Sequence, residues 1–154
     1  MVMEKRIGFS IRPFEPKDQD ECKRLVLSGL AGHFGALDLD LNEDLNDIEA
    51  SYPASGNIFL VVECGIGIIG AGALIFETGV ESRIARLSVS QTARRSGVGE
   101  AIVRKLITAA EEAGSQSINV ETNHDWHAAK NLYTKLGFAA IGSDEESVHL
   151  RLDL

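Results

Sequence analysis

Several kinds of residue are scarce in this chain of 154 residues, and each scarcity excludes a class of protein. The only two cysteines, Cys22 and Cys64, lie far apart and match no metal-ligand spacing, which is typical of reduced thiols in a cytoplasmic protein. The longest apolar run, residues 66–76, is too short and too rich in glycine to span a bilayer. Residues 1–6 contain no apolar signal core. We therefore expect a cytoplasmic protein with no membrane partner.

Positive charge is absent from a long interval of the chain. No lysine or arginine occurs from Leu25 to Ser82, although the interval contains nine acidic residues. These acids are Asp38, Asp40, Glu43, Asp44, Asp47, Glu49, Glu63, Glu77 and Glu81. A net charge of −8 with this distribution argues against nucleic-acid binding. The interval is either an ordinary solvated surface or an acidic groove that attracts a cationic ligand.

The rest of the composition is that of one globular domain over residues 1–154, with 44% hydrophobic and 25% charged residues. Alternating apolar residues predict strands, and apolar residues three or four apart predict helices. Strands are expected at 8–12, 58–63, 68–76, 84–89, 117–122, 139–142 and 148–152, and helices at 16–34, 42–52, 99–113 and 126–136. The crossover from residue 84 to residue 122 makes two strands parallel in a mixed α+β fold.

A glycine pattern at residues 65–70 has two interpretations. Gly65, Gly67 and Gly70 match the dinucleotide-binding pattern Gly-x-Gly-x-x-Gly, and a predicted strand precedes them. That motif also requires a helix that begins within it, whereas the residues that follow are too few and too β-like. We therefore interpret the pattern as a tight turn between two strands. Gly70 and Gly72 then mark a bulge or a close approach of backbone and ligand.

The stretch from Arg86 to Glu100 has the pattern of an anion-binding turn. A strand in which Leu87 and Val89 share one face leads into Arg-Arg-Ser-Gly-Val-Gly and then into a helix with one apolar face. The first N–H groups of a helix have no internal partner and carry partial positive charge. Glycines in the turn lack the Cβ atoms that would hold a phosphate away, and the arginines add charge.

Spacing narrows the choice of phosphate ligand. A Walker loop requires Gly-Lys-Ser/Thr, and Gly97 is instead followed by Val-Gly-Glu. The sequence Arg94-x-x-Gly97-x-Gly99 after a strand ending Leu-Ser-Val resembles the pyrophosphate turn of the GCN5-related N-acetyltransferases, the GNAT superfamily. Taken alone, it is also compatible with an ordinary strand-to-helix turn that carries surface arginines.

A second signature lies one helix and one strand later. The sequence Ala129-x-x-Leu132-Tyr133-x-x-Leu136-Gly137-Phe138 resembles the A-x-x-L-Y-x-x-x-G-F pattern of the same family. Both signatures occur in the family's order, and the resemblance covers essentially the whole chain. It implies a mixed, mostly antiparallel sheet with helices on both faces. Two middle parallel strands would splay apart, and the first would carry a bulge near Val89.

The resemblance also implies how acyl-CoA would bind in the slot between the splayed strands. Backbone groups of Leu87 and Val89 would pair with the pantetheine amides as another strand would. The implied cofactor contacts are Leu87, Ser88, Val89, Arg94, Arg95, Ser96, Gly97, Val98, Gly99 and Glu100. Many members carry asparagine seven residues before the tyrosine, where this chain has Trp126. Trp126 is therefore expected to pack on the pantetheine, to close the acceptor pocket or to anchor its helix.

A direct, metal-free transfer of acetyl from acetyl-CoA to an amine follows from the resemblance. The Val89 N–H would polarise the thioester carbonyl, and Tyr133 would donate a proton to the departing thiolate. Glu121 is the first candidate for the base that deprotonates the amine, and Glu63, His124 and a water relay stay open. His33 and Tyr52 are further residues within reach of a substrate, although packed or exposed roles are commoner for such residues.

The acceptor is open at this stage: a small amine or amino acid, a polyamine, an antibiotic or a protein amine. The acidic interval favours a cationic small molecule. A homodimer is common in the family. A hypothesis of another class is a sensor or interaction module that binds acyl-CoA without catalysis, and a NAD-binding oxidoreductase based on the glycine pattern is a third.

Overall fold

A seven-stranded sheet organises the chain, with the strand order β1-β2-β3-β4-β5-β7-β6. The computed structural model describes residues 8–34 and 39–154. The strands are β1 (Ser10–Pro13), β2 (Ile58–Cys64), β3 (Gly67–Phe76), β4 (Glu81–Val89), β5 (Ser117–Asn123), β6 (Ala139–Ser143) and β7 (Ser147–Asp153). The helices are η1 (Pro16–Asp18), α1 (Gln19–Phe34), η2 (Leu39–Asn46), α2 (Ile48–Ser51), η3 (Pro53–Ser55), η4 (Gln91–Ala93), α3 (Val98–Glu112) and α4 (His127–Lys135). The predicted α+β class is confirmed.

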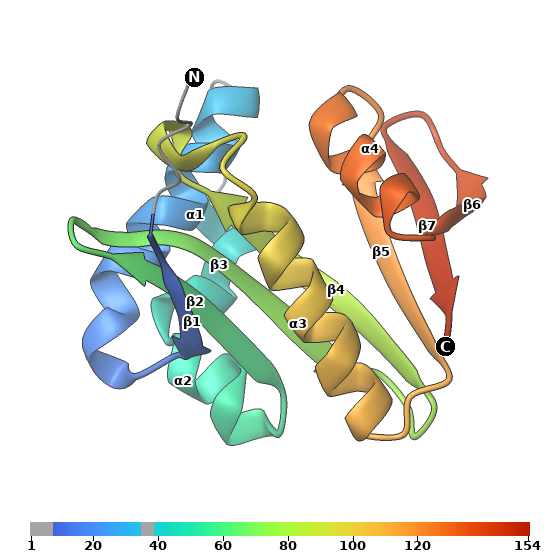
Figure 1. Cartoon of the computed structure of the whole chain (residues 1–154), viewed down its shortest axis with the longest axis horizontal. Helices are drawn as coiled ribbons and strands as arrows, with labels where there is room; N and C mark the ends of the chain where they lie inside the picture. Colours follow the sequence, from blue (N-terminus) through green and yellow to red (C-terminus); the bar gives the residue numbers. More distant parts are fainter. Residues whose placement is uncertain (1–7, 35–38) are drawn as a thin grey trace, which may run out of the picture.

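Strands β4 and β5 form the parallel pair that the crossover predicts, and every other neighbouring pair is antiparallel. The parallel pairing covers four residue pairs, from Glu81 opposite Ser117 to Ile84 opposite Val120. Beyond this point the two strands diverge, which Figure 1 shows as the gap between the green β4 and the orange β5. The splayed pair expected from the family resemblance is therefore present.

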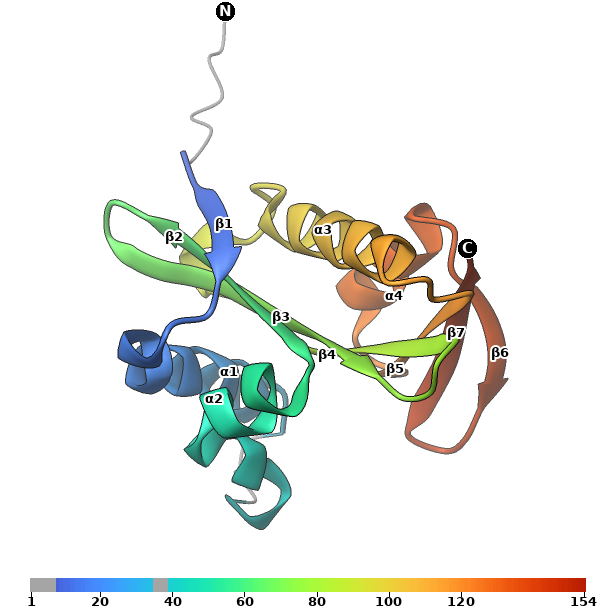
Figure 2. The ribbon, with the colours of Figure 1, turned by 90° about the horizontal axis from the view of Figure 1, so that it is seen from below.

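Helices cover both faces of the sheet, with α1 and α2 on one side and α3 and α4 on the other (Figure 2). Each side has its own apolar core. On the α1 side, Cys22, Leu45 and Phe59 are buried in one cluster, and on the α3 side Ile102, Leu106 and Tyr133 belong to a second. The sequence predicted one short helix at residues 42–52, whereas the structure has three short pieces there, η2, α2 and η3. Its predicted inward side chains Leu45, Ile48 and Tyr52 are buried.

A bulge interrupts the pairing of β4 with β3. Ala73 lies opposite Ala85 and Ala71 opposite Ser88, so two β4 residues face the single residue Gly72. One of these two, Arg86, has a left-handed φ of 57°, which is uncommon for a residue that has a side chain. The bulge was expected near Val89, and it lies two to three residues earlier in the strand, at Arg86 and Leu87.

The glycines of β3 allow a helix, rather than a ligand, to approach closely. A Cβ atom on Gly70 would lie 2.8 Å from Cγ1 of Val98, and one on Gly72 would lie 2.7 Å from Cγ2 of Ile102. Both neighbours belong to α3, so the missing side chains let this helix settle onto the sheet. The turn interpretation of the Gly-x-Gly-x-x-Gly pattern agrees with the β2–β3 pairing.

Gly72→Ala is expected to destabilise the fold by about 1–3 kcal/mol, because the added methyl group overlaps a buried helix side chain that has little room to move. Denaturant unfolding would measure this difference. Gly65→Ala is the matched control, since a Cβ there would meet no atom within 4 Å. Equal stability of the two variants would contradict the close approach of α3.

Cys22 and Cys64 are both free thiols, and burial raises the pKa of the Cys22 thiol to about 12. Within residues 8–34 and 39–154, the structure contains no helix with the length and apolarity that a bilayer crossing requires.

Candidate active site

The turn between β4 and α3 exposes the backbone N–H groups that the sequence predicted. Gly97 precedes the helix as its N-cap with φ 86°, and Arg95 also has a left-handed φ of 64°. The first intrahelical bond runs from the Ala101 N–H to the Gly97 carbonyl at 3.0 Å, and no side chain caps this end. The N–H groups of Val98, Gly99 and Glu100 are therefore available to an anion.

The charges around this turn also suit an anion. Arg94 and Arg95 are exposed, and neither forms an ion pair with any residue that the structure describes. Glu100 would repel a phosphate, but its carboxylate lies 2.9 Å from Nζ of Lys135 and 3.5 Å from an Arg104 nitrogen. The Lys135 hydrogen bond, followed by the nearby Arg104 charge, lowers the pKa of Glu100. Lys135 and Arg104 thus partly balance the negative charge of Glu100.

The edge of β4 presents unpaired backbone groups to the gap before β5. The Ser90 N–H donates to the Ile69 carbonyl at 2.8 Å, and Val89 lies opposite Gly70. Because successive peptide groups of a strand point to opposite edges, the Val89 N–H and C=O and the Leu87 C=O point away from β3. No described strand pairs with β4 at this edge beyond Ile84. The Ser88 backbone faces β3, and a contact of Ser88 with the cofactor stays a prediction.

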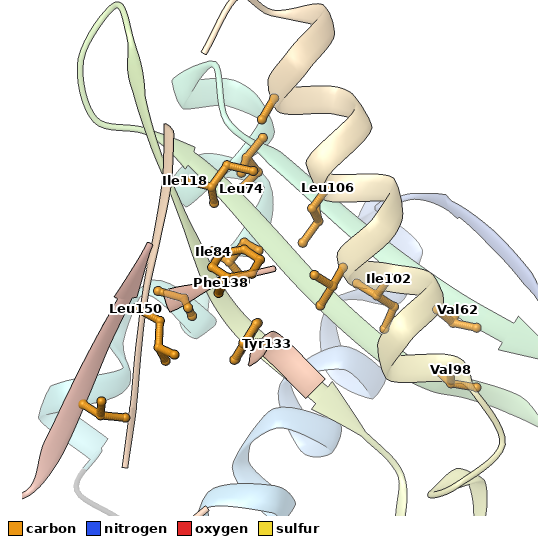
Figure 3. Close-up of a cluster of buried hydrophobic side chains, with 14 of the residues drawn as sticks. Val62, Leu74, Ile84, Val98, Ile102, Leu106, Ile118, Tyr133, Phe138 and Leu150 are labelled. Carbon is orange, nitrogen blue, oxygen red and sulfur yellow. The ribbon is translucent and has the colours of Figure 1, made fainter. Parts of the chain in front are cut away.

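Helices α3 and α4 and strand β4 meet at Gly99. A Cβ atom on Gly99 would lie 3.5 Å from both Cδ2 of Leu132 and Cγ2 of Val89. Leu132 directly precedes Tyr133, so both signatures of the sequence border the same gap. In Figure 3, Tyr133 lies between Ile102 of α3 and Leu150 of β7, within one buried cluster.

The environment of Tyr133 fits a neutral proton donor. Its side chain is only 3% exposed, and its ring packs edge-on against Phe138 at 5.4 Å. Its hydroxyl forms no hydrogen bond with the described residues, yet it is not among the fully buried oxygens without a partner, which are Ser117 Oγ and Thr122 Oγ1. Burial raises the pKa of Tyr133 above its ordinary value of 10. The hydroxyl therefore stays protonated at neutral pH.

Glu121 lies at the point where the two parallel strands separate. It follows Val120, the last residue of β5 that pairs with β4. Its carboxylate is 55% exposed and lies 3.9 Å from Nδ1 of His149, whose Nε2 lies 3.6 Å from Asp144. Oxygen or nitrogen atoms of these three groups lie within 4.8 Å of one another. They are an exposed cluster on the β5–β7 surface.

The other candidates for the base are engaged elsewhere. Glu63 lies on β2 and accepts from Arg12 at 2.9 Å, and this contact lowers the pKa of Glu63. Nε2 of His124 lies 2.7 Å from the Asp144 carbonyl oxygen. Tyr52 is buried and donates to Asp44 at 2.5 Å, so it is a packed residue rather than a substrate contact. The His33 side chain lies outside the described residues.

Trp126 is the N-cap residue of α4 and is half-buried. Its N–H donates to the Asn123 carbonyl at 3.1 Å, and its carbonyl accepts from Lys130 at 3.0 Å. It therefore anchors the start of the helix. A contact of its side chain with the cofactor stays a prediction.

A cavity of about 640 Å³ adjoins the end of β4 on the α1 side. Val89 and Arg94 line it, whereas Tyr133 and Glu121 do not. Glu21, Arg24 and Ser28 of α1 also line it. Sequence reasoning missed these α1 residues, since no local motif marks them and only the fold brings them to β4.

A partly buried ion pair between β4 and η2 was also missed. Arg86, at the bulge, donates to both oxygens of Asp44 at 2.5 and 3.0 Å and to Oδ1 of Asn42 at 2.8 Å. The Arg86 hydrogen bonds lower the pKa of Asp44 against the opposing effect of burial. These hydrogen bonds hold η2 against β4 at the position of the bulge.

Comparisons with known proteins agree with this geometry. A family model described as "Acetyltransferase (GNAT) domain" matches residues 55–140, which is more than half of the chain. Human N-acetyltransferase 8B is 31% identical over 122 residues, covering 75% of this chain and 54% of the relative. The chain thus spans about half the length of the curated relatives it matches.

Solved structures share the fold. A GNAT-family acetyltransferase from Staphylococcus aureus superposes with a TM-score of 0.86 at 21% identity, covering 96% of this chain and 99% of that chain. The PaiA N-acetyltransferase from Thermoplasma acidophilum, solved in complex with coenzyme A, gives a TM-score of 0.80 at 13% identity, covering 96% and 100%. The family match, the two signatures and the splayed sheet together show that this chain belongs to the GNAT acetyltransferase family.

Proposed function

We propose that the protein is an acyl-CoA-dependent N-acetyltransferase that moves an acetyl group from acetyl-CoA to the amine of a small acceptor. The observation that carries this proposal is the convergence of three features at one gap. These are the uncapped first turn of α3, the unpaired edge of β4 at Val89, and the buried Tyr133 of α4.

Binding of the co-substrate would use backbone groups first. The diphosphate of CoA fits the N–H groups of residues 95–100, where the helix dipole and two unpaired arginines favour negative charge. The pantetheine amides fit the outward N–H and C=O of Val89 and the C=O of Leu87. In this step the protein forms no covalent bond with the co-substrate. It only holds the thioester at the gap between β4 and β5.

The transfer itself needs one polarising group and two proton movements. The amine nitrogen attacks the thioester carbon, and the Val89 N–H stabilises the oxygen that becomes negative. Collapse of this intermediate forms the amide and breaks the C–S bond. The acceptor's ammonium group loses two protons: one passes through Glu121 to solvent before the attack, and the other leaves the tetrahedral intermediate for solvent. Tyr133 donates a hydrogen bond to the departing sulfur, and the released thiolate takes its proton from solvent.

The test is release of free thiol from acetyl-CoA in the presence of a panel of amines, with mass spectrometry to detect the acetylated product. The proposal expects turnover with at least one small amine. Binding of acetyl-CoA with no turnover on any amine would instead support the sensor or interaction module. A homodimer and a cytoplasmic location are further proposals, which gel filtration and cell fractionation would test.

A further inference from the structure

The cavity on the α1 side carries more positive than negative charge. Arg24 and Arg94 face it from α1 and from the phosphate-binding turn, and among the side chains that the structure describes Glu21 is the only acid that lines it. Uncharged hydrogen-bonding side chains, Ser28, Ser90 and Gln91, complete its polar lining. Val89 also lines the cavity, so a ligand bound there would lie next to the backbone group that is proposed to polarise the thioester.

The guanidinium group of Arg24 has no carboxylate partner among the residues that the structure describes. Its only hydrogen bond within the described chain runs from Nε to the Asp20 carbonyl at 3.3 Å. Glu21, three residues earlier, accepts instead from the Ile68 N–H at 2.7 Å. Since a guanidinium group offers five N–H donors, most of those of Arg24 are open to a ligand. Such a group in a cavity favours an anion that accepts paired hydrogen bonds.

The described acids of the acidic interval do not form an opposing, cation-binding wall. None of the seven whose side chains the structure describes lines the cavity, and the side chains of Asp38 and Asp40 lie outside the described part. Three of them are held by arginines: Asp44 by Arg86, Glu63 by Arg12 and Glu77 by Arg83. A fourth, Asp47, caps α2 by accepting from Ala50 at 3.1 Å. The expectation of a cationic acceptor therefore finds no support in the placement of these charges.

We infer that the acceptor is an amino carboxylic acid, whose carboxylate is bound by Arg24 while its amine faces Val89. This inference rests on the proposed N-acetyltransferase function and names the chemical class of its acceptor. Arg94 lines the cavity and also belongs to the proposed phosphate-binding turn, so its charge would act on both ligands. Arg24, which belongs to α1 and not to the turn, is the residue that separates acceptor recognition from cofactor recognition.

The experiment measures acetyl transfer to three sets of amines: the standard amino acids, their carboxamides, and the polyamines putrescine and spermidine. The amino acids are expected to be the better acceptors. Arg24→Gln is expected to raise the KM for them about tenfold or more, the range that one charged hydrogen bond supports, while the KM for acetyl-CoA stays within about twofold. Arg24→Lys should recover part of the loss, because it restores the charge but not the fork of donors.

Lys23→Gln is the matched control, because it removes the same charge from the neighbouring residue of α1. Lys23 donates to Asn46 at 2.7 Å and does not line the cavity. The Lys23→Gln variant should therefore show unchanged KM values for the amino acids and for acetyl-CoA. Turnover that favours polyamines or carboxamides, or an Arg24→Gln variant with unchanged KM, would overturn the inference and leave the transferase function intact. No turnover with any of the three sets would overturn the inference, and no turnover with the wider amine panel would overturn the transferase function as well.

Discussion

Tyr133→Phe is expected to lower kcat by about tenfold or more and to leave the affinity for acetyl-CoA within about twofold. The substitution removes one hydroxyl group and keeps the ring that packs on Phe138 at 5.4 Å. Since this hydroxyl forms no hydrogen bond within the described chain, its removal leaves no partner unsatisfied. The substitution should therefore slow only the step in which the CoA sulfur leaves the carbonyl carbon.

The size of this effect follows from the pKa values of the two groups. Burial raises the pKa of Tyr133 above 10, whereas a free thiol titrates at about 8.5. Complete proton transfer from the phenol to a free thiolate is uphill, so the hydroxyl acts mainly by donating a hydrogen bond as charge develops on sulfur. We therefore expect a loss nearer tenfold than the upper limit of about ten-thousandfold for general acids.

The other tyrosine of the chain provides the control. Tyr52 is equally buried, at 4% exposure, but its hydroxyl donates to Asp44. Tyr52→Phe should cost about 1–3 kcal/mol of stability, because it removes one partner of a half-buried carboxylate, and it should leave kcat unchanged. Steady-state kinetics, calorimetry with acetyl-CoA and denaturant unfolding would compare the two variants. Tyr133→Phe should lower kcat, whereas Tyr52→Phe should lower stability and leave kcat unchanged. A Tyr133→Phe enzyme with normal kcat would remove this residue from the mechanism.

Local chemistry made much of the fold predictable. Helix α3 starts after Gly97 and ends before Gly114, and both glycines have left-handed φ values of 86° and 87°. Such positions are readable because glycine adopts this conformation with little strain. Alternation likewise placed Leu87 and Val89 on one face, and the crossover rule gave the parallel pair. Each of these signals depends on residues close together in the chain.

The features that sequence reasoning missed all join distant segments. The bulge at Arg86 is held by Asp44 of η2, and nothing in the β4 sequence reveals that partner. Glu63 looked free to act as a base until the fold placed it beside Arg12 of β1. The cavity depends in the same way on Arg24 of α1 meeting the end of β4. Local patterns therefore predicted the turn and the strand edge of the proposed cofactor site, whereas the proposed acceptor side became visible only in the tertiary structure.

Gly97→Glu is expected to weaken the binding of acetyl-CoA by about a hundredfold or more. Gly97 has a left-handed φ of 86°, and a Cβ added there would meet no atom within 4 Å, so a side chain has room but leaves a strained backbone. A carboxylate at the start of α3 would face the diphosphate that the N–H groups are proposed to bind. One pair of like charges about 5 Å apart costs about 3 kcal/mol at an effective dielectric constant of about 20, which is about a hundredfold in affinity.

Gly97→Gln separates charge from backbone strain, because glutamine has nearly the same shape and must adopt the same φ. It should weaken binding by no more than about tenfold, which corresponds to the cost of a left-handed side-chain residue. Calorimetry with acetyl-CoA at low and high salt would compare the two variants, and the difference between them should shrink as salt screens the repulsion. Equal affinities of the two variants at low salt would mean that no phosphate lies at this turn. In that case the uncapped N–H groups of α3 would have to be explained without the cofactor.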